Sequence, residues 1–475
     1  MPCPTCDWAH EFPTIKTSGN DDPAPRRSLR DPIHCIIVQP ATDDDTAAHE
    51  RDLGAAGIDA DLDGLSADPP DAGNLISTAA DTLTRIAFTR VVTALPRTAS
   101  FMLRSFTRGD RSADAGNPPI PVTPSLGAHV AIDEALLALA RGPNRFPTTE
   151  RFERVGAEVR DAYDLFDREG WLAEPASYHL SPPELRNPAI ERAIRPQMHF
   201  ERILFHSDYA PHHGEPGRER WLGYEHNHTA YAWMFRHRDR PRPWIVCLHG
   251  FGTGMPVLDV PAFRAQELHE RFGLNVVLPV LPLHGPRKVG RMSGEALMDL
   301  DIMNTVHGVT QAIWDVRRLL GWIRTQEPTA VGVFGLSLGA HVTAMLASVE
   351  PDLDLALAGI PVCNLTEMFM RHSPRSVKER AKSHQVFGRR TNALTRVISP
   401  LALEPRVPPE ARCLFAGLGD RMTGPRQAFL LWQHWGEPEI SWYKGNHMAY
   451  RFSGQVRDFI ESVLEARGFR DEPLA

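Results

Sequence analysis

The chain has 475 residues, of which 42% are hydrophobic, and its formal net charge is −7. This length exceeds one ordinary domain, so two structural regions with a sizeable core are expected. The negative charge provides no general attraction to nucleic acid, and six scattered cysteines argue against a disulfide scaffold. Residues 1–7 lack the charged and apolar segments of a secretory signal, so we expect a cytoplasmic protein.

Residues 1–74 are rich in Asp, Pro, Ala and Gly and show little periodicity, which predicts a mostly disordered leader. Within it, Cys3 and Cys6 form a CxxC pair, with His10, His34 and Cys35 nearby. One CxxC without a second well-spaced pair is weak evidence for zinc. We therefore predict no metal and no cofactor.

Residues 75–198 are predicted to form an N-terminal helical region. Residues 75–108 alternate apolar side chains with arginines, and charges and Pro96 interrupt them too often for a membrane-spanning helix. This stretch could lie on an anionic membrane surface, or form a helix pair packed on the rest of the protein, which we favour. After a Pro-rich linker, residues 131–140 and 151–166 show helical periodicity.

From residue 199 to the end, strand-like and helix-like segments alternate. Helical stretches include residues 261–272 and 306–326. The alternation and the apolar strands predict a mostly parallel sheet covered on both faces, with an antiparallel pair at its start. The eight candidate strands are 200–206, 229–235, 244–248, 275–281, 330–334, 355–360, 411–417 and 440–444.

Residues 335–339 (GLSLG) follow the fifth strand and precede residues 340–347, a helix-forming stretch. Strand, sharp turn and helix are the context of a nucleophile elbow, G-x-S-x-G. The turn needs small residues two positions before and after the serine, because larger side chains would collide across it. Ser337 is thus the candidate nucleophile; the alternative is a Gly-rich turn with a solvated serine.

A serine hydroxyl needs a histidine to take its proton and an acid to orient that histidine, in the chain order Ser, acid, His. His447 lies just past the last strand and is the candidate base. Asp420 is the first carboxylate past the seventh strand and is the candidate acid, although Gly-Asp also serves as an ordinary turn. The rival residues after Ser337 are His341, His372, His384 and His434 for the base, and Glu437 and Glu439 for the acid.

Backbone N–H groups must stabilise the negative oxygen that forms during attack. One donor would be Leu338, directly after the nucleophile. The other should come from residues 248–254 (LHGFGTG) after the third strand, where we assign Phe251 with Gly252 as the alternative. We expect His249 to be structural rather than catalytic.

The His-Gly-Phe-Gly, Gly-Leu-Ser-Leu-Gly, Gly-Asp and Gly-Asn-His motifs, in this order, resemble the α/β-hydrolase superfamily over about residues 199–470. The resemblance implies an eight-stranded sheet and a triad of Ser337, Asp420 and His447. Residues 281–287 are similar to the corresponding loop of esterase-like and prolyl-oligopeptidase-like members. The resemblance does not extend to the N-terminal region and does not identify a substrate.

Between the sixth and seventh strands, residues 364–399 hold eight basic residues and two acidic ones. In the superfamily, inserts at this place often form a helical cap. A basic cap could attract an anionic acyl substrate or an anionic lipid surface, but solvated helix faces explain the same residues.

These features predict a serine hydrolase that cleaves a carboxylic ester or related acyl substrate, a small molecule or a lipid, through an acyl-enzyme on Ser337. Thioester, peptide and acyl-transfer chemistry use the same groups and stay open. A non-catalytic interaction protein on a hydrolase scaffold, or a peripheral-membrane lipase that uses residues 75–108, are the alternatives. The sequence does not indicate an oligomeric state.

Overall fold

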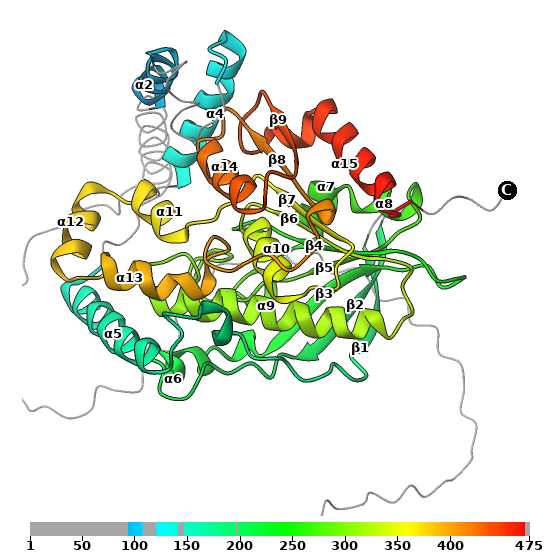
Figure 1. The fold of residues 1–475 in the computed structure, drawn as a ribbon, viewed down its shortest axis with the longest axis horizontal. Helices are drawn as coiled ribbons and strands as arrows, with labels where there is room; N and C mark the ends of the chain where they lie inside the picture. Colours follow the sequence, from blue (N-terminus) through cyan, green and yellow to red (C-terminus); the bar gives the residue numbers. More distant parts are fainter. Residues whose placement is uncertain (1–93, 108–119, 141–146, 196–197, 471–475) are drawn as a thin grey trace, which may run out of the picture. The chain divides into compact units, whose positions relative to one another are not determined.

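The computed structural model describes residues 94–107, 120–140, 147–195 and 198–470, all within one unit of the chain, Asp71–Ala475 (Figure 1). The predicted leader, its Cys3–Cys6 pair and residues 75–93 of the amphipathic stretch lie outside these ranges.

The described residues form a nine-stranded sheet with the order β1-β2-β3-β5-β4-β6-β7-β8-β9. Strands β4 to β9 are parallel to one another. Strands β1, β2 and β3 pair antiparallel at one side of the sheet, and β3 also pairs antiparallel with β5. The mostly parallel sheet, its antiparallel edge and all eight predicted strands are therefore confirmed. The strands are β1 (Ala189–Arg195), β2 (Met198–His206), β3 (Thr229–Phe235), β4 (Trp244–Leu248), β5 (Asn275–Pro279), β6 (Val331–Leu336), β7 (Leu355–Gly359), β8 (Arg412–Gly417) and β9 (Glu439–Tyr443).

Helices cover both faces of the sheet, which explains why its central strands read as continuous apolar runs. Strand β4 is buried throughout, and its successive side chains enter opposite cores: Val246 packs on one face and Cys247 on the other. One core includes α9 (Ile302–Arg324), α10 (Leu338–Val349) and α14 (Pro425–His434). The other includes α7 (Pro256–Phe263), α8 (Ala265–Glu270) and α15 (Gly454–Ala466).

Two elements differ from the prediction. The ninth strand, β1, lies in the segment assigned to the helical region, so the sheet begins before residue 199. Its apolar residues recur at helical spacing (AIERAIR), but pairing with β2 along its whole length overrides that local signal. The helix predicted at 261–272 is instead two helices, α7 and α8, joined at Arg264, which has a left-handed φ of 54°.

Within the described residues, three α-helices precede the sheet: α2 (Ala94–Thr107), α4 (Pro124–Ala140) and α5 (Thr149–Arg168). The insert after β7 is helical as predicted, with α11 (Leu365–His372), α12 (Arg375–Ser383), α13 (Arg389–Leu394) and a short 3₁₀ helix, Thr395–Ile398. Helix α5 lies beside α12 and α13 (Figure 1), where Phe152 stacks on His384 with ring centroids 5.7 Å apart. In α2, Phe101 is buried and Arg421 lies over its ring, so this helix packs on the protein body.

No helix in the described ranges is long and apolar enough to cross a membrane. Likewise, the described side chains contain no group of three or more His, Cys, Asp or Glu residues arranged to hold a metal ion.

Candidate active site

Ser337 occupies a sharp turn between β6 and α10. Its backbone angles, φ 55° and ψ −110°, are strained for a residue with a side chain. A Cβ built on Gly339 would lie 1.8 Å from the carbonyl oxygen of Leu248, and one on Gly335 would lie 2.2 Å from the carbonyl oxygen of Gly339. Only glycine fits at either position, so the predicted steric requirement of the turn is confirmed.

The structure brings Asp420 and His447 together in a buried pair. His447 Nδ1 lies 2.7 Å from Asp420 Oδ2, and Asp420 also accepts hydrogen bonds from the backbone N–H and hydroxyl of Thr423. Because the carboxylate can only accept, the Nδ1 atom carries a proton, and Nε2 has a free lone pair whenever the ring is neutral. A glycine contact joins the two loops, since Gly419 N–H donates to the carbonyl oxygen of Gly445 at 2.9 Å.

Electrostatics favour a charged pair at this place. Burial alone would raise the pKa of Asp420, but His447 and Thr423 outweigh it and hold that pKa at about 2. Burial alone would lower the pKa of His447, but Asp420 and then Asp133 outweigh it and raise that pKa above its ordinary value. His447 is therefore a stronger base than a solvent-exposed histidine.

Most of the rival residues are engaged elsewhere, and Glu437 is exposed. His341 lies against the carbonyl oxygens of Val362 and Ile398, and Glu439 pairs with Arg467 at 3.4 Å. The other rival histidines bond to backbone carbonyl oxygens or stack on Phe152; they are His372, His384 and His434.

The loop after β4 lies against the serine turn. A Cβ on Gly250 would lie 3.6 Å from Ser337 Cβ, and Gly252 has a left-handed φ of 82°. Leu338 is the first residue of α10, so its N–H has no acceptor within the helix. Phe251, Gly252 and Leu338 are thus all at this end of the sheet, and their role as oxyanion donors stays a prediction.

His249 holds the same loop in place. Its Nδ1 donates to the carbonyl oxygen of Gly250 at 2.8 Å and its Nε2 accepts the N–H of Leu281 at 3.0 Å. Burial lowers the pKa of His249 to about 4, so the ring is neutral. These contacts agree with a structural rather than catalytic role.

One residue of the site was not predicted: Asp133, on α4. Its Oδ2 atom accepts the backbone N–H of Arg421 at 2.9 Å and of His447 at 3.1 Å, so a single oxygen joins the two loops. Its Oδ1 atom is buried and has no hydrogen-bond partner among the described residues. Burial, and then the charge of Asp420, raise the pKa of Asp133 to about 6 although both N–H donors oppose this.

A sequence signal for Asp133 does exist. Leu126, Val130 and Asp133 follow the spacing i, i+4, i+7, so they share one face of α4, and all three are buried. A carboxylate on the apolar face of a helix is costly unless it has partners. The pattern could therefore have marked Asp133, but it could not have identified partners about three hundred residues away along the chain.

A mostly parallel sheet covered on both faces, with a strained serine turn after a central strand, defines an α/β-hydrolase fold. No family model matches the chain. Two uncharacterized proteins of Mycobacterium tuberculosis, MT2702 (strain CDC 1551 / Oshkosh) and Rv2627c (strain ATCC 25618 / H37Rv), are each 41% identical to it over 353 residues, 74% of this chain and 84% of theirs. The chain belongs to the family of these mycobacterial proteins.

Solved structures similar to this one include esterases and peptidases. Acetyl xylan esterase 1 from Thermoanaerobacterium sp. JW/SL YS485 is 15% identical with a TM-score of 0.44, covering 63% of this chain and 93% of the esterase. The acylaminoacyl peptidase of Pyrococcus horikoshii is 12% identical with a TM-score of 0.38, covering 61% of this chain and 44% of the peptidase.

The strain at Ser337 can be measured. Ser337→Gly removes the steric penalty of the positive φ, whereas Ser337→Ala retains it. We expect the glycine variant to have a free energy of unfolding about 1 kcal/mol higher than the alanine variant, even though glycine gains entropy in the unfolded chain. Denaturant unfolding of both variants checks this, and an alanine variant as stable as the glycine variant would rule out the strain.

The burial of Asp133 should affect stability in a pH-dependent way. Asp133→Asn keeps an oxygen that can accept both N–H groups but removes the charge. Because the folded-state pKa of about 6 lies above the ordinary 3.8, the wild-type chain loses stability as pH rises between these values. At about pH 8 the asparagine variant should therefore be more stable than the wild type, with a free energy of unfolding higher by up to roughly 3 kcal/mol and a higher unfolding temperature. This difference should fade toward about pH 4.

Thermal unfolding at both pH values measures this difference. Asp133→Ala is the matched comparison, since it removes both hydrogen bonds and should be less stable than Asp133→Asn at either pH. An advantage of Asp133→Asn that does not depend on pH would contradict the argument.

Proposed function

We propose that this protein is a serine hydrolase that cleaves a carboxylic ester or a related acyl compound. The observation that carries the proposal is the buried Asp420–His447 pair, which lies at the same sheet edge as the strained Ser337 turn. Ser337, Asp420 and His447 follow the carboxyl ends of the parallel strands β6, β8 and β9, in the chain order that this chemistry uses.

In this mechanism His447 Nε2 takes the proton from Ser337 Oγ as the oxygen attacks the substrate carbonyl carbon. The C=O electron pair moves to the carbonyl oxygen, which the N–H groups of Leu338 and of Phe251 or Gly252 stabilise. Collapse expels the leaving alkoxide, which receives the proton from His447 Nε2. Water then attacks the acyl group by the reverse sequence and frees Ser337.

Asp420 acts on His447 rather than on the substrate. Its carboxylate keeps the proton on Nδ1 and stabilises the imidazolium that forms in each half of the reaction. Asp133 supplies a second negative charge and positions the backbone of His447. A scaffold without catalytic activity would have no need of a strained serine and a buried ion pair at the same end of the sheet, which is why we prefer hydrolysis to a purely binding role.

Apolar side chains next to the proposed site support a substrate with an apolar part. Phe251 is 45% exposed and Met448, directly after His447, is 38% exposed. Exposed apolar groups beside a reactive centre favour the burial of an acyl or alcohol chain on binding.

Labelling with a fluorophosphonate probe tests the proposal. Wild-type protein should be labelled and should hydrolyse p-nitrophenyl esters, whereas Ser337→Ala and His447→Ala should lose labelling and about 10³-fold or more of the turnover. His434→Ala is the matched control, because this rival histidine is bonded to Leu403 and should not affect labelling. A folded wild-type chain that resists the probe would contradict the proposal.

The pH profile gives an independent test. Hydrolysis needs neutral His447, and its raised pKa means that kcat/KM should fall to half its plateau at a pH above the ordinary 6.5. Asp133→Asn removes a negative charge that stabilises the imidazolium, so its half-maximal pH should lie lower than that of the wild type. Asp161→Asn, the same change on the exposed face of α5, is the control and should leave the profile in place. A half-maximal pH unchanged by Asp133→Asn would contradict this electrostatic role.

A further inference from the structure

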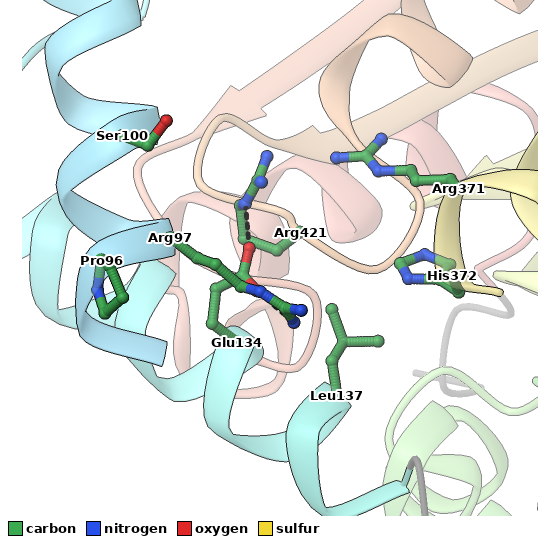
Figure 2. A pocket seen from close by; sticks show the side chains of 8 residues that line it. All are labelled: Pro96, Arg97, Ser100, Glu134, Leu137, Arg371, His372 and Arg421. Carbon is green, nitrogen blue, oxygen red and sulfur yellow. Dashed lines mark hydrogen bonds and ion pairs between the residues drawn. The ribbon is translucent and has the colours of Figure 1, made fainter. Parts of the chain in front are cut away.

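A polar pocket lies between the N-terminal helices α2 and α4, the insert helix α11 and the loop after β8 (Figure 2). Its volume of about 380 Å³ falls within the roughly 300–1,000 Å³ typical of small-molecule sites. The loop is the one that carries Asp420, so the pocket adjoins the proposed active site. The charged or titratable side chains that line it are Arg97, Glu134, Arg371, His372 and Arg421.

Positive charge in the pocket exceeds negative charge. Arg421 Nε donates to Glu134 Oε1 at 2.9 Å, and Arg97 Nη1 lies 3.8 Å from the other oxygen of the same carboxylate. Glu134 is the one carboxylate among the described residues that line the pocket, and three guanidinium groups line it as well. Among the described lining residues, the three guanidinium groups therefore exceed the carboxylates by two charges.

Arg371 differs from the other two guanidinium groups of the lining, which both pair with Glu134. It forms no ion pair with any carboxylate in the described part of the chain, and its Nη1 donates to the carbonyl oxygen of Thr423 at 3.2 Å. Burial, and then the charge of Arg421, lower the pKa of Arg371, and the carboxylates of Asp420, Glu367 and Glu134 oppose this only in part. A partly buried cation beside a second cation is unfavourable, and a bound anion would remove that cost.

His372 adds a polar atom that has no protein partner. Its Nε2 bonds to the carbonyl oxygen of Met422 at 2.8 Å, and its Nδ1 is buried without a hydrogen bond in the described residues. Nδ1 can accept a hydrogen bond from a ligand hydroxyl. Figure 2 shows Arg371 and His372 side by side on α11, across the pocket from Glu134.

We propose that this pocket binds the carboxylate or phosphate group of a small ligand, with Arg371 as the main donor and with Arg97 and Arg421 adding charge. A guanidinium group matches both anions because its planar N–H groups can donate in pairs. The anion is either part of the substrate or a free ion that binds beside the site. Only the first of these sources rests on the proposed function.

Calorimetric titration of the full chain with inorganic phosphate and with succinate tests the pocket without requiring turnover. Wild type should bind at least one of them with a dissociation constant in the millimolar range or tighter. Arg371→Gln should weaken that binding by about tenfold or more, because a charge-assisted hydrogen bond is lost. Arg375→Gln is the matched control: Arg375 is 92% exposed on α12, pairs with Glu379 and should not affect binding.

A second variant guards against loss of structure, since Arg371→Gln also removes the hydrogen bond to Thr423. Arg97 is 45% exposed, and its ion pair with Glu134 is long, at 3.8 Å. Arg97→Gln should weaken binding by about threefold through loss of one partly exposed charge. The absence of binding to either anion in wild type, or equal affinities in the Arg371, Arg97 and Arg375 variants, would overturn the proposal.

Hydrolysis of p-nitrophenyl acetate and p-nitrophenyl hemisuccinate distinguishes the two sources. For a substrate anion, kcat/KM is higher for the hemisuccinate, phosphate competes with it, and the preference falls in Arg371→Gln but not in Arg375→Gln. For a free anion, wild type shows no preference, and phosphate changes acetate turnover in wild type but not in Arg371→Gln. Failure to hydrolyse either ester would contradict the proposed function, while the calorimetric result would still decide the pocket.

Discussion

A single carboxylate oxygen positions the two loops that carry Asp420 and His447, on which the proposed chemistry depends. Asp133 Oδ2 accepts a backbone N–H from Arg421 and another from His447, so a helix outside the sheet holds both the acid loop and the base loop. The carboxylate is buried and its second oxygen has no partner in the described residues, which makes the arrangement costly. The N-terminal helices are therefore part of the candidate site, and any change that displaces α4 should act on His447.

The basic residues of the insert, residues 364–399, have several separate roles in the structure. Three of its arginines contact N-terminal residues: Arg380 lies over Phe152, Arg390 over Tyr163, and Arg396 donates to the carbonyl oxygen of Leu172. Arg375, by contrast, is exposed, and Arg371 enters the pocket. From the sequence, these basic residues were expected either to attract an anion or to lie on solvated helix faces. Several of them instead pack the insert against α5 and the residues that follow it.

What the sequence predicted well depends on local physics. The serine turn is encoded within five residues. Glycine is required at positions 335 and 339, because a Cβ atom at either one would collide with the backbone. The eight predicted strands are apolar runs that both faces of the sheet bury. Strand β1 was missed because its apolar residues have helical spacing and only pairing with β2 decides its conformation. Asp133 and the anion pocket were missed because they depend on contacts between residues that are far apart in the chain.

Three unfavourable features of this structure lie close to the candidate site. Ser337 has a strained backbone, Asp133 is a buried carboxylate with a raised pKa, and Arg371 is a partly buried guanidinium group without an ion pair in the described chain. All three lie near segments that follow the carboxyl ends of parallel strands. Ser337 follows β6, and Asp133 and Arg371 both bond to the loop after β8. Random defects would be removed by substitutions that stabilise the fold, such as glycine for Ser337 or asparagine for Asp133. The position of these three features after the carboxyl ends of parallel strands supports placing the proposed site there.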